Sequence, residues 1–277
     1  MRGCSCRGTA GFAHVSCLAE QAKILVAEGE ENNLGDKAFN ERWARWDTCS
    51  LCEQDYHGVV RCALGWACWK TYLGRPEAED PRHLATSVLG NGLSVANHHE
   101  EALSVKEAEL SMLRRIGALE EDVLAAQGNL ASTYRAIGRH EEALRMRREV
   151  YAGFRSLFGN CDNRTLMAAN NLVFQLQILG KHAEAVSILR KPLSDARRTF
   201  GDDHEMTLGL RSLLADSLLG SGTSPTIHHV REAIAIREDV CKRSRRLLGG
   251  AHPDTQRRQR ALESARSALA LLGLSEG

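Results

Sequence analysis

A repeat of about 42 residues runs through the chain from about residue 84 and restricts the fold more than any other feature. Three segments share a His-x-Glu-Ala core, in which x is any residue: Asn97–Leu103, Gly138–Leu144 and Gly180–Val186. Ala233 marks a fourth unit, which follows a longer turn rich in Gly and Ser. A period of this length is typical of a solenoid, in which each unit packs only against its neighbours.

Each unit has the pattern of two helices joined by a glycine. Leu130, Tyr134 and Ile137 have the spacing of one helical face, and Gly138 follows them. Glycine adopts the left-handed conformation that ends helices at little cost. Short polar residues before the next helices are expected to cap them; these are Asn163, Asp203 and Asp254. The sequence therefore predicts a mainly α fold, an α-solenoid of about four 42-residue helical hairpins with a concave surface.

The repeat resembles the long tetratricopeptide repeats of kinesin light chains. The resemblance rests on the Gly-x-His-x-Glu-Ala core and on Gly249–Thr255, which reads Gly-Gly-Ala-His-Pro-Asp-Thr, and it covers about two thirds of the chain. It implies stacked hairpins over residues 83–277 that bind a protein or peptide on the concave side. An irregular helical bundle is the alternative.

Asparagines recur on the first helix of successive repeats. Asn129 and Asn171 are one repeat apart, and Asn170 stands beside Asn171. Asparagine forms helices only moderately well, so its return at one position indicates a use. The resemblance implies that these amides hold the backbone of an extended peptide in a groove; bracing or capping of neighbouring helices is the alternative. Leu213 has the equivalent position in the next unit, where we expect the groove to become apolar.

The N-terminal part differs in composition from the repeats. The first 70 residues hold seven of the nine cysteines and all four tryptophans, and the composition changes near Pro76–Pro81. We predict a metal module at residues 1–55, a connecting helix and linker at 56–82 and a repeat domain at 83–277. The helix is expected over Val59–Leu73, with Cys62 and Cys68 in the core. No secretory signal precedes the cysteines, which favours metal ligands in a reducing compartment; we expect an intracellular, cytoplasmic location.

Six residues have the order and spacing of zinc ligands: Cys4, Cys6, His14, Cys17, Cys49 and Cys52. Thiolates and imidazoles a few residues apart chelate Zn²⁺ well. The order resembles the third to eighth ligands of the RING-CH (RING-variant) finger of ubiquitin ligases, including the His-x-x-Cys-Leu sequence at His14–Leu18. In the arrangement of that family, Cys4, Cys6, Cys49 and Cys52 share one ion, and His14 and Cys17 keep half of a second site.

The chain departs from the RING-CH pattern in two ways. The first cysteine pair of the family is absent, and the simplest explanation is that the chain lacks its true N-terminus. The polar stretch Glu28–Asn40 separates the ligands and is expected to be a surface insertion. Buried cysteines in a small helical cap are the alternative. A redox role of the Cys-x-x-Cys motif has less support, because no strand–helix pattern surrounds it.

Two functions follow from these patterns. The first is a zinc-binding protein-interaction scaffold and ubiquitin ligase, in which the finger positions a ubiquitin-conjugating enzyme and the repeats recruit the substrate. The alternative is a non-enzymatic tetratricopeptide adaptor with a vestigial finger. Glu53 follows the last ligand, where active ligases often carry a basic residue, and this favours the adaptor.

Composition and motifs exclude other classes of function. The net charge of +1 gives no reason to expect nucleic acid or an anionic membrane as a partner. No apolar run reaches the roughly 18 residues that predict a membrane-spanning helix. No phosphate-binding loop or catalytic motif is present, so we expect no catalytic side chains.

Overall fold

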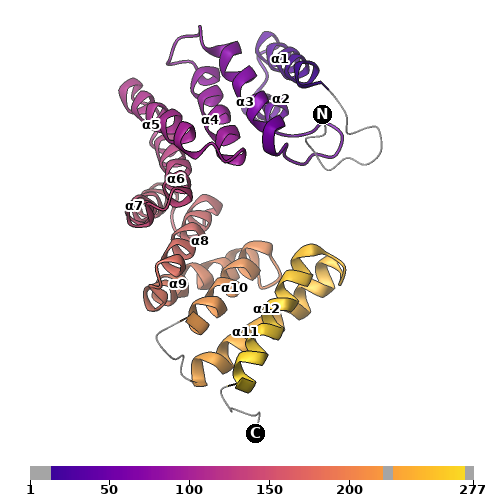
Figure 1. Ribbon diagram of the computed structural model, residues 1–277, viewed down its shortest axis with the longest axis vertical. Coiled ribbons are helices and arrows are strands. Elements are labelled where there is room, and N and C mark those ends of the chain that lie inside the picture. Colours follow the sequence, from indigo (N-terminus) through magenta and orange to yellow (C-terminus); the bar gives the residue numbers. More distant parts are fainter. Residues whose placement is uncertain (1–13, 221–226, 272–277) are drawn as a thin grey trace. The chain divides into compact units, whose positions relative to one another are not determined.

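The computed structural model describes residues 14–220 and 227–271. These residues form twelve α-helices and a short 3-10 helix (Figure 1). They contain no β-strand beyond an isolated bridge between Thr48 and Asp55. None of the helices in this part of the chain is long and apolar enough to span a membrane. The mainly α fold is therefore confirmed.

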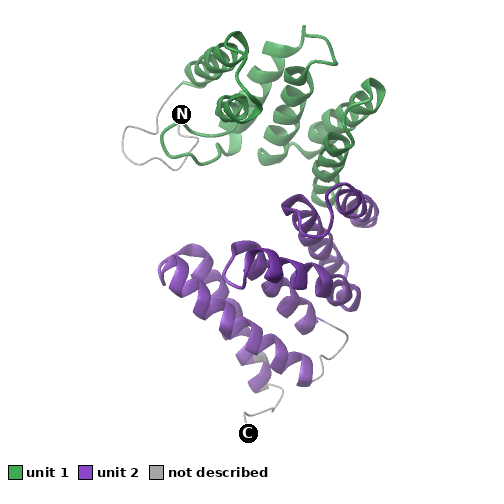
Figure 2. Cartoon of the chain, turned by 180° about the vertical axis from the view of Figure 1, so that it is seen from behind, with its two compact units in different colours: residues 1–139 green, residues 140–277 purple. Residues whose placement is uncertain are grey.

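The chain divides into two compact units, residues 1–139 and 140–277 (Figure 2). The predicted boundary near Pro76–Pro81 lies inside the first unit, where α3 packs against α4. The first unit contains α1 (Val15–Glu31), α2 (Asp36–Trp43), η2 (Ala44–Trp46), α3 (Gly58–Tyr72), α4 (Asp80–Val95), α5 (His99–Ile116) and α6 (Glu120–Ala136). The second contains α7 (His140–Phe158), α8 (Asn163–Ile178), α9 (His182–Phe200), α10 (Glu205–Gly220), α11 (Ile227–Leu248) and α12 (Pro253–Leu271).

The repeats form the antiparallel helix pairs that the sequence predicts. Consecutive helices pack together from α3 to α6 in the first unit and from α7 to α12 in the second. The alanines of the repeat core, Ala102, Ala143 and Ala185, are fully buried. Gly138 and Gly180 have φ values of 82° and 68°, so both adopt the left-handed conformation expected at a helix end. The solenoid prediction is confirmed by these pairs.

Two helix caps lie one or two residues from their predicted positions. The Asp162 carboxylate, not Asn163, accepts the Arg164 backbone N–H at 2.8 Å before α8. Before α10, the His204 ring nitrogen Nδ1 accepts from the Met206 N–H at 3.2 Å. Asp203 is instead held by an ion pair with Arg243 at 2.6 Å. An imidazole nitrogen can cap as a carboxylate does, because it also offers a lone pair near the first free amides.

The helix α12 repeats the cap that is seen before α10. The His252 Nδ1 atom accepts from the Asp254 N–H at 3.2 Å, and Asp254 is already the second residue of α12. Asp254 pairs with Arg257 at 2.8 Å. The Gly-x-x-His sequence that the two loops share therefore specifies a histidine cap, and the predicted roles of Asp203 and Asp254 as caps are wrong.

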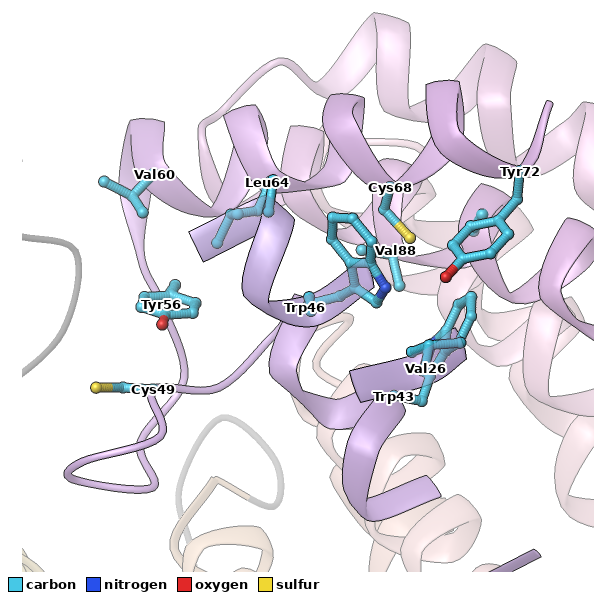
Figure 3. Packing of buried hydrophobic residues seen from close by; sticks show 13 residues of the cluster. Val26, Trp43, Trp46, Cys49, Tyr56, Val60, Leu64, Cys68, Tyr72 and Val88 are labelled. Carbon is cyan, nitrogen blue, oxygen red and sulfur yellow. The ribbon is translucent and has the colours of Figure 1, made fainter. Parts of the chain in front are cut away.

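An aromatic cluster forms the core of the N-terminal helices (Figure 3). Trp46 is completely buried, and its ring lies 6.2 Å from that of Tyr72, edge to face. Trp43 lies 5.2 Å from Tyr72. Cys68 is fully buried in the same cluster, as predicted, and burial raises the pKa of its thiol. This arrangement accounts for two of the four tryptophans of the first unit, Trp43 and Trp46.

The stretch at Glu28–Asn40, which the sequence predicts to be a surface insertion, is mostly helical and packs partly against the core. It contains the end of α1 and the first residues of α2, joined by a turn at residues 32–35. Val26 on α1 is buried, and Phe39 on α2 packs against the aromatic cluster. The helical periodicity of this stretch is weak in the sequence, because only one side chain per turn faces the core and the others are mostly polar.

Candidate functional site

The first helices of the repeats line a cavity in each unit. The cavity of the second unit has a volume of about 380 Å³. We call it the second-unit groove, and it is lined by Asn170, Phe174, Gly209, Ser212, Leu213, Asp216, Arg237, Val240, Arg257, Arg258 and Ala261. These residues come from α8, α10, α11 and α12.

One side of the second-unit groove is apolar. Phe174 on α8 is 44 % exposed. Leu213 on α10 is partly buried beside the core of this unit. Leu213, at which the sequence predicts a more apolar groove, belongs to this lining. The groove therefore offers an apolar surface to a ligand.

A glycine opens the floor of the same groove. Gly209 lies inside α10, and a Cβ atom placed on it would meet no atom within 4 Å. A glycine inside a helix lowers the stability by roughly 1 kcal/mol relative to alanine. Keeping this position without a side chain therefore has a cost in stability. Because Gly209 has no side chain, the groove is wider at α10.

Arginines form the other side of the groove. Arg237 is neutralised by Asp216 at 2.6 Å and also donates to the Ala261 carbonyl. Arg258 donates to the neutral Ser244 hydroxyl at 2.6 Å, so no carboxylate offsets its charge there. Arg257 is 72 % exposed and forms an ion pair with Asp254 at 2.8 Å. The groove consequently has a net positive wall on α12.

The first unit has a cavity of about 410 Å³ whose lining includes several polar residues. We call it the first-unit cavity, and it is lined by Arg61, Asn91, Ser94, Val95, His99, Lys106, Asn129, Ser132, Thr133, Arg135 and Ala136. Lys106 is only 3 % exposed, and burial lowers its pKa to about 8. The two cavities therefore differ in their lining residues: Phe174 and Leu213 lie in one, and a buried lysine lies in the other.

The predicted groove asparagines lie in different places. Asn129 lines the first-unit cavity, and Asn170 lines the second-unit groove. Asn171 is exposed on α8 and belongs to neither lining. The sequence missed Phe174 and Gly209. Phe174 could have been found from its position in the repeat, because it stands one repeat after Ser132, which lines the first-unit cavity.

The Cys-x-x-Cys motif forms a tight turn between η2 and α3. The Cys49 N–H donates to the Gln54 carbonyl at 2.9 Å, and the Glu53 N–H donates to the Cys49 carbonyl at 2.9 Å. The Leu51 N–H points at the Cys49 sulfur at 3.5 Å. Glu53 adopts a positive φ of 55°. In Figure 3 the Cys49 sulfur points away from Trp46.

The other predicted zinc ligands are not brought together in the described part of the chain. His14 directly precedes α1, and Cys17 is exposed in its first turn. Cys4 and Cys6 lie outside the described residues. Among residues 14–220 and 227–271, no three His, Cys, Asp or Glu side chains form a group that could hold a metal ion. The zinc site therefore stays a prediction.

The comparisons with known proteins support the repeat. Residues 123–163 and 165–205 match the tetratricopeptide repeat family. Among curated proteins, none matches this sequence.

Several solved structures have a similar fold. Crystal structures of nearly identical TPR-like repeats, from a protein assigned as a kinesin light chain of Podosopora anserina, include one with a TM-score of 0.58 and 17% identity, covering 86% of this chain and 99% of that chain. BtubC (BKLC) from P. vanneervenii has a TM-score of 0.60 and 14% identity, covering 94% of this chain and 85% of that one. A Rap protein complexed with Competence and Sporulation Factor has a TM-score of 0.51 and 16% identity, covering 91% and 65%. The chain thus carries tetratricopeptide repeats with the fold seen in kinesin light chains.

Proposed function

We propose that this chain is a protein-interaction scaffold whose repeats hold an extended peptide in the second-unit groove. The observation that carries the proposal is the groove itself, which combines an apolar side, an open glycine floor and a positive wall. Solenoids of helical hairpins use such surfaces for binding because stacked first helices present their side chains side by side. The Rap protein complex supports this use of the fold.

The lining residues suggest how a peptide is held. The side-chain amide of Asn170 has no hydrogen-bond partner among the described residues, and it offers both a donor and an acceptor to a peptide backbone. A large apolar side chain of the peptide fits over Gly209, between Phe174 and Leu213. An acidic side chain suits Arg257 and Arg258. The expected ligand is a peptide with an apolar residue next to an acidic one.

Substitution of Gly209 tests the proposal. Peptides are selected from a display library on the full chain, and their affinities are then measured for two variants. Gly209→Trp fills the groove from its floor and should weaken binding at least about tenfold. Gly209→Ala adds one methyl group in open space, so it is the matched control and should bind normally. Equal affinities for the parent chain and Gly209→Trp would exclude this groove.

A zinc site is the second candidate, supported by the Cys49–Cys52 turn. A backbone N–H directed at a cysteine sulfur stabilises the thiolate form that binds metal. We propose that Cys49 and Cys52 bind Zn²⁺ with Cys4 and Cys6. These four thiolates fit the tetrahedral structural sites that zinc prefers.

Metal analysis of the purified chain tests this second proposal. We expect about one zinc per chain, lost in the Cys49→Ser/Cys52→Ser double variant. A chelator should disorder the turn and spare the repeats, as measured by hydrogen exchange. Cys62→Ser is the matched control, because Cys62 packs against Leu89 and Leu93 and is not a proposed ligand. A chain that holds no zinc after refolding with the metal would refute the site.

We propose the adaptor in preference to the ubiquitin ligase. The repeats alone account for a binding function, whereas ligase activity also needs a conjugating enzyme to dock on a complete finger. The adaptor predicts no autoubiquitination by the full chain with a panel of conjugating enzymes. Activity that is lost on Cys49→Ser would favour the ligase.

A further inference from the structure

The first-unit cavity has a biased charge. Among the described residues that line it, three are bases that are mostly or always protonated at neutral pH, and none is acidic. These bases are Arg61, Lys106 and Arg135. Arg61 is held by Asp47 at 2.8 Å and by Asp55 at 3.4 Å, so its charge is largely offset. The buried charge at the wall comes from Lys106. A cavity with this lining favours a negatively charged ligand.

Lys106 is fixed at the wall of the cavity by neutral oxygen atoms. Its Nζ atom donates to Ser94 Oγ at 2.9 Å, to Thr133 Oγ1 at 3.1 Å and to the Asn129 carbonyl at 3.4 Å. Glu109 is near enough to attract the ammonium electrostatically, but it accepts its hydrogen bond from Ser87, and no carboxylate among the described residues forms a direct ion pair with Lys106. A buried ammonium without an ion-pair partner is costly, and a bound anion would reduce that cost.

Two free amides flank this lysine. Asn91 comes from α4 and Asn129 from α6, and neither side chain has a hydrogen-bond partner among the described residues. The buried Nδ1 atom of His99 also lacks one. These groups supply donors for oxygen atoms, while Lys106 supplies the charge.

We propose that the first-unit cavity binds a compact oxyanion, a phosphate or carboxylate group, between the Asn91 and Asn129 amides and beside the Lys106 ammonium. This site is independent of the peptide groove, because its residues belong to the first unit and those of the groove to the second. Failure of one proposal therefore leaves the other intact.

The protonation of Lys106 gives the site a pH signature. The charged or titratable groups around it are Glu109 and His99 on α5, Arg61 on α3 and Arg135 on α6. Burial lowers the pKa of Lys106 to about 8, so the ammonium is mostly present at pH 7.5 and mostly lost at pH 9.5. Anion affinity should fall across this range.

The test follows the side-chain carbonyl ¹³C signals of Asn91 and Asn129 in the full chain. Sodium sulfate is titrated against chloride of equal ionic strength, because sulfate keeps its charge over the whole range. We expect saturable shifts of both signals and binding about tenfold weaker at pH 9.5 than at pH 7.5. Parallel titrations with inorganic phosphate and with acetate show which of the two anion classes binds more tightly.

Two variants locate the site. Lys106→Met keeps the length of the side chain without its charge and should remove both the binding and its pH dependence. Ser132→Asp places a negative charge in the lining and should also abolish binding, whereas its neutral control Ser132→Asn should bind normally. The proposal is overturned if no anion shifts the two asparagines, or if sulfate binds Ser132→Asp as tightly as the parent chain.

Discussion

Glu109 shows how a single buried residue controls stability. The carboxyl group is 2 % exposed, and burial raises its pKa to about 7 although Ser87 donates a hydrogen bond to it. Between its ordinary value of 4.5 and 7, the folded chain keeps a proton that the unfolded chain has lost. The free energy of unfolding therefore falls as pH rises through this window.

We predict that Glu109→Gln removes this pH dependence. The parent chain should lose about 2 kcal/mol more than the variant between pH 4.5 and 7. Lys106, whose pKa is lowered, has the opposite effect and adds stability as pH rises from about 8 to 10.5. Urea unfolding followed by tryptophan fluorescence measures the difference, since all four tryptophans lie in the first unit. Parallel pH curves for the two proteins would contradict the assignment.

Sequence reasoning at the level of residues succeeded where position in a repeat determines the environment. It predicted the buried alanines, the left-handed glycines and the core position of Cys68. Asn129 and Asn170 line cavities and Asn171 lines neither of them, and the role of all three in peptide binding stays a prediction. Adjacent helical residues differ in direction by about 100°, so a phase error of one residue changes the side that a side chain faces.

At the level of elements, the contact between α3 and α4 depends on two glycines. A Cβ atom on Gly92 would lie 2.8 Å from the Arg61 carbonyl oxygen, and one on Gly65 would lie 3.0 Å from the Leu89 Cα atom. Both neighbours are backbone atoms, so a flexible side chain cannot move aside. These glycines allow the close approach of the two helices.

We predict that Gly92→Ala and Gly65→Ala each destabilise the first unit by about 1–3 kcal/mol, because overpacking outweighs the gain in helix propensity. Gly209→Ala, with open space around the new methyl group, should instead stabilise α10 by up to about 1 kcal/mol. Urea unfolding, monitored by fluorescence for the first unit and by circular dichroism for α10, tests both signs. Stabilisation by Gly92→Ala would contradict the close packing.

The helices themselves were predictable because their apolar spacing is strong. The expected helix at Val59–Leu73 is α3, displaced by a single residue. The helical nature of Glu28–Asn40 was not predictable from its polar composition, since it depends on Phe39 packing against a cluster formed by distant residues. Tertiary packing decided that segment.

At the level of the whole molecule, the repeat period was the sequence feature that predicted the fold. It predicted the solenoid, and the tetratricopeptide match at residues 123–163 and 165–205 confirms it. The chemistry of the two cavities was not predictable, because each lining combines residues from three or more helices. The period gives the position of these helices, whereas the ligand depends on the few residues that vary from repeat to repeat.

The most direct test of the proposed function is a crystal structure of the full chain with a peptide selected on it. The account predicts that the peptide lies along α8, α10 and α12, with its backbone bonded to the Asn170 amide and an apolar side chain over Gly209. A peptide bound elsewhere, with the second-unit groove empty, would contradict the central claim.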